Sequence, residues 1–213
     1  MLLADFVRLS PLVRGQVVDG LSAAIDTVAG DAPESHRFLR YQWFAAGIAA
    51  HGGAARTIVI ESDNQPVIAL PLAEISGTAR LAAIPGGCAP FRSFPVSPMA
   101  DAACYAALIE QIGQTANGLR IGPVAADDPA VAPLLETARA RGWGIVDRAV
   151  ETGGGEDDAF WRGLISDPVL LKMLPALKMQ KAAHDLREWL LLKPGIPALL
   201  GRLLLGVRGR AFS

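Results

Sequence analysis

Apolar residues recur at helical spacing in the segment 35–72 and then give way to an extended pattern. The helix-like part carries four apolar residues at this spacing: Leu39, Trp43, Ala46 and Ala50. Gly52 and Gly53 follow after His51, and paired glycines are typical of a helix end. We therefore predict a helix over residues 39–50.

A β-hairpin is predicted after this helix. The β-branched run from Ile58 to Ile60 favours a strand. Asp63, Asn64 and the following Gln65 suit a tight reversal of the chain. Pro66 fits the start of the returning strand, where a missing N–H does least harm.

The same patterns predict further elements up to residue 150. They are a helix at 12–28, a strand at 80–85, a helix at 99–116, a strand at 119–124, a helix from Asp128 to Gly142 and a strand at 143–150. Asp128 is expected to cap its helix, with Pro129 at the first helical position. The fold class that follows is α/β (α+β), with one mixed sheet that contains a three-strand antiparallel meander and is flanked by helices.

Composition changes after residue 150. Three consecutive glycines, Gly153–Gly155, are followed by acidic residues, so we predict a domain over 1–150 and a linker over 151–171. Residues 172–213 are basic and rich in Leu, and we expect helices near 176–192 and 198–207. This segment either packs its Leu face on the domain or a second copy, or makes peripheral contact with an anionic membrane surface.

Bulk properties narrow the classes of function. A chain of 213 residues with 51% hydrophobic content can bury one sizeable core. The net charge of −1 argues against nucleic acid as a partner, because phosphate binding needs an excess of Lys and Arg. Cys88 and Cys104 have no CxxC spacing, so no metal site is expected and a reduced, cytoplasmic location is the default. The first residues lack a basic leader, so secretion is not expected.

Three stretches carry a resemblance to a known family. They are FLRYQWFAAGIAAHGGAARTIVIESDNQPVIALPL, PGGCAPFRSFPVSP and LRIGPVAADDPAVAPLLETARARGWGIV, which together span roughly residues 35–150. They resemble the N-terminal half of the CelD/BioF2-like acetyltransferases, a FemAB-like group built from two tandem GNAT units. The predicted order of three antiparallel strands, loop, helix, strand, helix and strand, with helices before it, is also that of the GNAT fold.

The resemblance implies an N-acyltransferase that uses acetyl-CoA or another acyl-CoA as co-substrate. It implies a small-molecule or cell-envelope amine as acceptor. Complete members hold donor and acceptor between two units, whereas the matched part here corresponds to one, so the activity is expected to be incomplete, absent or restored in a homodimer. The alternative is a non-catalytic binding or assembly module whose C-terminal helices dock a protein partner or a membrane surface.

A GNAT unit normally holds the pyrophosphate of coenzyme A at a glycine-containing turn before a helix. Here the corresponding residues run from Ala83 to Ala89 and lack the basic or amide lead and the family's spacing. Gly86 and Gly87 are therefore interpreted first as a turn and second as a pyrophosphate cradle. Pro85 removes one N–H that a cradle would use.

Trp43, Phe91 and Arg92 are the candidate substrate-binding residues. Arg92 lies among aromatic residues and prolines, so its guanidinium either holds a carboxylate or phosphate or is an exposed loop cation. Trp43 is either a substrate platform or a core residue. Trp43 and Tyr41 are two apart on a helix and cannot share a face, so at least one is expected in the core.

No catalytic group can be identified from spacing alone. The three histidines, His36, His51 and His184, do not form an i, i+3 or i, i+4 pair. Ser35 and Ser93 lack a nucleophile motif such as GxSxG. Cys88 is expected to act as a small buried thiol; the alternative, a nucleophile whose pKa is lowered by a helix terminus, is the less favoured interpretation. Asp127 and Asp128 are best explained as helix-capping residues, which leaves the catalytic residues unknown.

Overall fold

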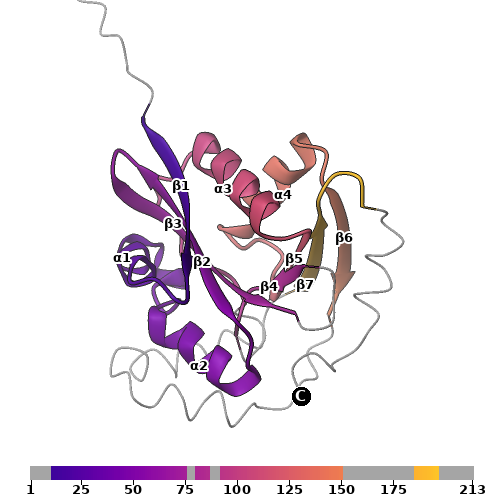
Figure 1. Ribbon diagram of the computed structural model, residues 1–213, viewed down its shortest axis with the longest axis horizontal. Coiled ribbons are helices and arrows are strands. Elements are labelled where there is room, and N and C mark those ends of the chain that lie inside the picture. Colours follow the sequence, from indigo (N-terminus) through magenta and orange to yellow (C-terminus); the bar gives the residue numbers. More distant parts are fainter. Residues whose placement is uncertain (1–10, 76–79, 87–91, 151–184, 197–213) are drawn as a thin grey trace, which may run out of the picture.

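The computed structural model describes residues 11–75, 80–86, 92–150 and 185–196, and the described residues form one mixed sheet with helices on both faces (Figure 1). The elements in chain order are β1 (Val13–Asp19), α1 (Ala24–Asp31), the 3₁₀ turn η1 (Glu34–His36), α2 (Tyr41–His51), β2 (Ala55–Ser62), β3 (Gln65–Glu74), β4 (Leu81–Ala83), α3 (Ala102–Thr115), β5 (Gly118–Ala125), α4 (Val131–Ala140), β6 (Gly144–Ala149) and β7 (Leu186–Leu192).

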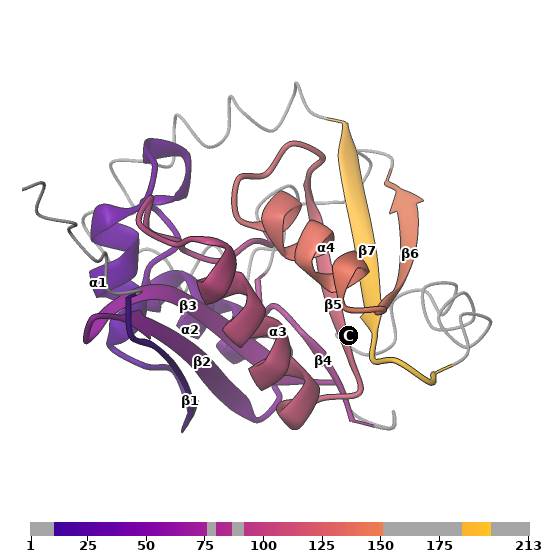
Figure 2. The ribbon, with the colours of Figure 1, turned by 90° about the horizontal axis from the view of Figure 1, so that it is seen from above.

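The strands lie in the order β1-β2-β3-β4-β5-β7-β6. The pairs β1–β2, β2–β3 and β3–β4 are antiparallel, β4 and β5 are parallel, and β7 is antiparallel to both β5 and β6. Helices α1 and α2 lie on one side of the sheet and α3 and α4 on the other (Figure 2). The predicted mixed α/β class with an antiparallel meander is confirmed.

The predicted hairpin is confirmed as β2 and β3. Asp63 and Asn64 form the reversal with φ of 52° and 63°. Positive φ at both central positions gives the turn the twist that a two-residue hairpin needs, and Asp and Asn tolerate that conformation. Residues Ile58 to Ile60 are all buried, so both faces of β2 are covered here; α3 packs on β2, and α1 packs on the neighbouring β3.

The predicted helix 39–50 is confirmed as α2, and Gly52 ends it with a φ of 74°. Gly47 faces the chain that leaves β4. A Cβ at Gly47 would lie 2.8 Å from the backbone nitrogen of Gly86, a distance that real contacts do not reach. The absence of a side chain at Gly47 therefore lets α2 approach Gly86 closely.

The prediction of a helix over 12–28 is wrong for its first half. Residues 13–19 form β1, which pairs with β2 along its whole length, and the helix begins only at Ala24. The segment contains three valines, which favour a strand, and Gly20 with a φ of 80° separates it from α1. The apolar residues of this segment fit both the helical and the strand periodicity, and pairing with β2 makes the segment a strand.

The prediction of a helix near 176–192 is wrong for residues 186–192, which form β7 between β5 and β6. Trp189 and Leu191 contribute to the main core, while Leu190 and Leu192 form a small cluster on the other face. A strand buried on both faces is a continuous apolar run, and periodicity cannot distinguish such a run from a buried helix.

The sheet therefore includes residues beyond the range 1–150 that we expected to hold the domain. The expected linker 151–171, the earlier part of the first expected helix and the helix expected near 198–207 lie outside the described residues.

Strand β4 is short and leaves the sheet early. It pairs with β5 from Leu81 to Ala83, and Ile84 N–H donates to the Arg120 carbonyl at 3.3 Å. Further along the chain, Arg92 N–H donates to the Pro123 carbonyl of β5 at 3.3 Å, the Pro95 carbonyl accepts from Ala69 N–H of β3 at 3.3 Å, and Val96 forms a bridge with Ile68. Regular pairing of β4 with β5 thus ends at Ala83, and residues 87–91 lie outside the described part of the chain.

Candidate functional site

Two of the three candidate residues from the sequence lie together where β4 leaves the sheet. A Cβ at Gly86 would lie 3.2 Å from Cγ of Arg92 and 3.8 Å from Nε1 of Trp43. The N–H of Arg92 donates to the Pro123 carbonyl of β5 at 3.3 Å. Trp43, Gly86 and Arg92 therefore meet at one point beside β5, while Phe91 lies outside the described residues.

Trp43 is a core residue. Its side chain has no exposed surface, and its ring meets that of Phe38 edge to face at a centroid distance of 4.8 Å. The hypothesis of a Trp43 substrate platform therefore has no support in this conformation, because a platform needs an accessible ring face. Tyr41, two residues earlier, is 40% exposed, and the expectation that at least one of the two aromatics packs in the core is confirmed.

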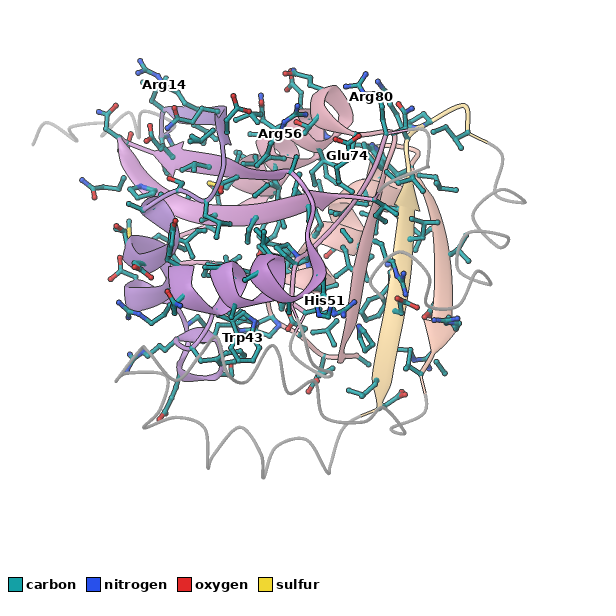
Figure 3. The ribbon with its side chains drawn as sticks, turned by 60° about the horizontal axis from the view of Figure 1, so that its bottom comes forward. Arg14, Trp43, His51, Arg56, Glu74 and Arg80 are labelled. Atoms are coloured by element: carbon teal, nitrogen blue, oxygen red, sulfur yellow. The ribbon has the colours of Figure 1, made fainter. Side chains whose placement is uncertain are left out.

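Arg92 is half-buried, so it is not the fully exposed loop cation of the simpler interpretation. Its backbone is fixed against β5, and its side chain lies over Gly86. Figure 3 shows Trp43 and His51 on the same helix, α2. Among the described residues, this is where the sequence-predicted site converges.

The N-terminus of α3, which follows β4 along the chain, is already occupied by a carboxylate. Asp101 accepts a hydrogen bond from the N–H of Cys104 at 3.0 Å. This bond lowers the pKa of Asp101 below its ordinary value, so the group is charged at neutral pH. A pyrophosphate at this helix end would meet that negative charge, which disfavours a cradle of the usual kind. Gly87 and Cys88 lie outside the described residues.

Three polar residues from distant parts of the sequence meet beside the N-terminus of α4. Nε2 of His36 lies 3.0 Å from Oδ2 of Asp128 and 3.3 Å from Oγ of Ser93, and Ser93 donates to Oδ1 of Asp128 at 2.9 Å. All three side chains are buried. Asp128 also accepts from the N–H groups of Ala130 and Val131, both at 3.0 Å.

This network contains the residue types of a catalytic triad, a serine, a histidine and an aspartate, but it does not have the arrangement of a triad. In a relay, the base uses one nitrogen for the nucleophile and the other for the acid. Here Asp128 and Ser93 face the same nitrogen of His36, and the Ser93 hydroxyl donates its hydrogen bond to Asp128. His36 therefore cannot remove a proton from Ser93 in this geometry, and the cluster ties η1, the chain before α3 and the start of α4 together.

Sequence reasoning recognised only part of the cluster. The capping role of Asp128 was predicted and is confirmed, although α4 begins at Val131, two residues later than a helix with Pro129 at its first position would. The union of His36 with Ser93 and Asp128 was missed. These residues lie far apart in sequence, and no local spacing indicates that they meet.

A second polar cluster lies within the sheet. Glu188 of β7 is fully buried and receives hydrogen bonds from Arg120 of β5, at 2.5 Å, and from Arg148 of β6. The two guanidinium groups compensate the buried carboxylate and connect three adjacent strands. The cluster stabilises the sheet.

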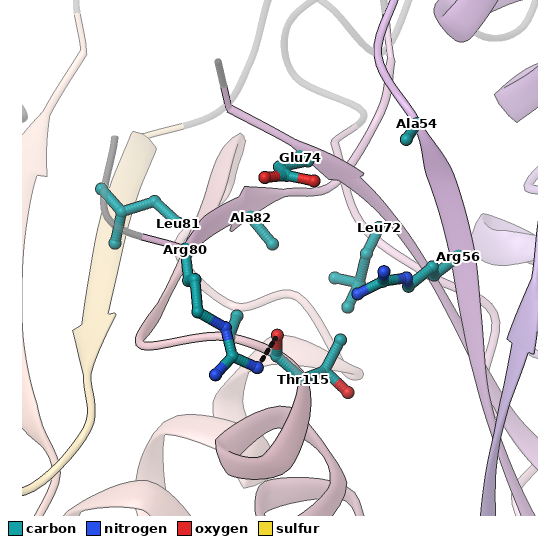
Figure 4. A pocket seen from close by; sticks show the side chains of 9 residues that line it. Ala54, Arg56, Leu72, Glu74, Arg80, Leu81, Ala82 and Thr115 are labelled. Carbon is teal, nitrogen blue, oxygen red and sulfur yellow. Dashed lines mark hydrogen bonds between the residues drawn. The ribbon is translucent and has the colours of Figure 1, made fainter. Parts of the chain in front are cut away.

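A surface cleft of about 230 Å³ lies at the other end of β4 (Figure 4). Arg56 and Arg80 approach it from opposite sides, and Glu74 lies between them. Arg80 donates to the carbonyls of Gln114 and Thr115 at the end of α3, and Arg56 lies 3.6 Å from Asp19. Both cations already have partners, so the cleft has no strong anion site.

A smaller cavity of about 180 Å³ lies next to the His36 cluster. It is lined by Pro33, His36, Val96, Ser97, Pro98, Ala100, Tyr105, Pro129, Ala130 and Pro133. The residues come from the link between α1 and α2, the chain before α3, α3 itself and the start of α4.

Within the described part of the chain, no three His, Cys, Asp or Glu side chains gather as a metal ion would require. None of the described helices combines the length and the apolar character needed to span a membrane. In comparisons with known proteins, no family model, no curated protein and no solved structure matches this chain.

Proposed function

We propose that the chain is an N-acyltransferase of the GNAT type, whose acyl-thioester donor lies along β5 where β4 leaves the sheet. The observation that carries the proposal is the interrupted pairing of these parallel strands. β4 accompanies β5 only to Ala83, whereas β5 continues to Ala125. An extended, amide-bearing arm such as that of an acyl-CoA could use the backbone groups next to Ile121 as an added strand does.

The order of elements supports the same class. Helices precede an antiparallel meander, β2 to β4, which is followed by α3, β5, α4 and β6. This is the order that the family resemblance implies. A fold can host several activities, so the site must carry the functional argument.

The chemistry would be attack of an amine nitrogen on the thioester carbonyl. A C–N bond forms, the C–S bond breaks, the amine loses a proton and the thiol departs. The described residues supply positioning: the backbone of β5 would orient the donor, and the lack of a side chain at Gly86 lets Trp43 and Arg92 pack closely around this point. Acetyl-CoA or a longer acyl-CoA is the proposed donor, and a small-molecule or cell-envelope amine the proposed acceptor.

One observation favours the alternative, a non-catalytic binding module. Carboxylates cap both helices that follow the parallel strands, Asp101 at α3 and Asp128 at α4. Neither helix end is therefore open to the phosphates of a coenzyme.

Calorimetric titration with acetyl-CoA and with a long-chain acyl-CoA distinguishes the two functions. The acyltransferase proposal predicts saturable binding of at least one thioester. Gly86→Leu, whose side chain would push Arg92 and Trp43 away from this point, should weaken the binding at least tenfold. Gly30→Leu is the matched control, because a side chain at Gly30 meets nothing within 4 Å. If neither thioester binds, the acyltransferase proposal is contradicted and the non-catalytic binding module remains as the proposed function.

A further inference from the structure

The cavity next to the His36 cluster is lined by a tyrosine whose hydroxyl is available as a hydrogen-bond donor. Tyr105 is only 4% exposed and lines this cavity. Among the described residues, its hydroxyl has no hydrogen-bond partner. The hydroxyl oxygen is not closed off from solvent, so it can donate to a molecule that occupies the cavity.

The cavity offers hydrogen-bond donors, and neither Lys nor Arg lines it. Burial, together with the negative charge of Asp128, raises the pKa of Tyr105 well above its ordinary value, so its phenol keeps its proton and can donate. The Ser97 hydroxyl accepts from the N–H of Met99 at 3.2 Å and retains its own proton for a second partner. Both ring nitrogens of His36 are engaged by Ser35, Ser93 and Asp128.

The rest of the lining is apolar. Four prolines contribute to it, Pro33, Pro98, Pro129 and Pro133, together with Val96 and two alanines. Proline has no N–H, so these walls offer no donor that competes with Tyr105. Water next to such walls makes few hydrogen bonds and is readily displaced by an apolar group.

We propose that this cavity binds a small neutral molecule with an apolar body and one carbonyl oxygen that accepts the hydrogen bond of Tyr105. The volume of about 180 Å³ sets the size of the ligand. One water takes about 30 Å³ in the liquid, so the space holds roughly six waters or one fragment such as benzamide. A carboxylate is disfavoured because neither Lys nor Arg lines the cavity and Asp128 is close.

Three isosteric probes, benzamide, benzoate and benzamidine, test the ligand class by amide NMR titration of the full chain. Benzamide is expected to saturate and to shift the resonances of Ser97, Tyr105 and Ala130. Benzoate and benzamidine should bind at least tenfold more weakly, because the first is repelled and the second has no carbonyl acceptor. Equal affinity for all three probes, or benzamide shifts confined to other residues, would overturn the proposal.

Two variants test the site itself. Tyr105→Phe removes only the hydroxyl and should weaken benzamide roughly three- to tenfold, the value of one hydrogen bond, with an unchanged unfolding midpoint. Ala100→Leu should fill the cavity and abolish the shifts. Tyr41→Phe is the matched control, since Tyr41 is the only other tyrosine and is exposed. Unchanged affinity in both cavity variants would contradict the assignment. The result does not depend on acyl-CoA binding.

Discussion

Nε2 of His36 lies 3.0 Å from Oδ2 of Asp128, although 92 positions separate the two residues in the sequence. This contact joins the link between α1 and α2 to the start of α4. The same carboxylate accepts from Ser93 and from two backbone N–H groups of α4. One buried side chain thus holds three parts of the chain together, next to the cavity that we assign to a small neutral ligand.

Asp128→Ala should therefore destabilise the protein by roughly 3 kcal/mol. The variant loses a helix cap, worth about 1 kcal/mol, and leaves the buried polar groups of His36 and Ser93 without their acceptor. Urea unfolding measures the change. Asp127→Ala is the control, because Asp127 is exposed and its loss should change stability by no more than about 0.5 kcal/mol. Equal effects of the two substitutions would show that the cluster does not contribute as described.

Glu188→Ala should also destabilise the sheet, by about 3 kcal/mol. The substitution leaves Arg120 and Arg148 facing each other without the carboxylate between them. Both guanidinium groups are partly exposed, so the expected cost lies at the lower end of the range for broken buried ion pairs. Glu136→Ala on the exposed face of α4 should have almost no effect in the same thermal unfolding experiment. A change at Glu188 as small as that at Glu136 would contradict the role of the cluster.

The cap of α3 should make stability depend on pH in a predictable direction. The pKa of Asp101 is lowered from 3.8 by the hydrogen bond from Cys104 N–H, so its contribution is present above pH 3.8 and is lost as pH falls through the lowered value. Asp101→Ala should cost about 1 kcal/mol at pH 7, and the difference from the wild type should shrink below pH 3.8.

Asp101→Ser provides the control for this pH effect, because serine caps the helix without a charge. Its stability should follow the Asp101→Ala variant in parallel as the pH falls. A constant difference between wild type and Asp101→Ala from pH 7 to pH 2 would show that the charged cap does not act as inferred. The same Asp101→Ala variant should bind acyl-CoA no less tightly than the wild type, since a negative charge has been removed.

Gly122 lies next to the proposed donor site, and its replacement tests how closely β5 and β7 approach. Gly122 has a φ of 100°, and a Cβ there would lie 2.5 Å from the Arg187 carbonyl oxygen. Gly122→Ala should cost at least about 2 kcal/mol from conformational strain and this clash. Gly20→Ala has a similar φ of 80° but open space around it, so it should cost only about 1 kcal/mol of strain. Equal costs would mean that the close approach contributes nothing.

The parts of the fold that depend on local rules could be predicted from the sequence. The turn at Asp63 and Asn64, the end of α2 at Gly52 and the cap at Asp128 each follow from the conformational preference of a few neighbouring residues. The two wrong predictions, in which strands were predicted as helices, have the same cause. Residues 13–19 and 186–192 become strands through pairing with distant segments, which their own periodicity does not report.

The candidate site shows the same division. Trp43 and Arg92 were selected by residue type, and they do meet at Gly86, but only the packing of α2 against the chain after β4 reveals that Trp43 is fully buried. Tyr105 was not selected, because a tyrosine on a helix gives no sign of whether its hydroxyl has a partner. That information lies in the convergence of α3, α4 and the link before α2.

The position of the thioester donor is the central claim, and amide NMR with a non-reactive thioether analogue of acetyl-CoA tests it most directly. The account predicts saturable shifts centred on Ile84, Gly86, Ile121 and Gly122, and their loss in Gly86→Leu but not in Gly30→Leu. Saturable shifts centred elsewhere, for example on the cleft of Arg56 and Arg80, or no shifts at millimolar analogue, would contradict it.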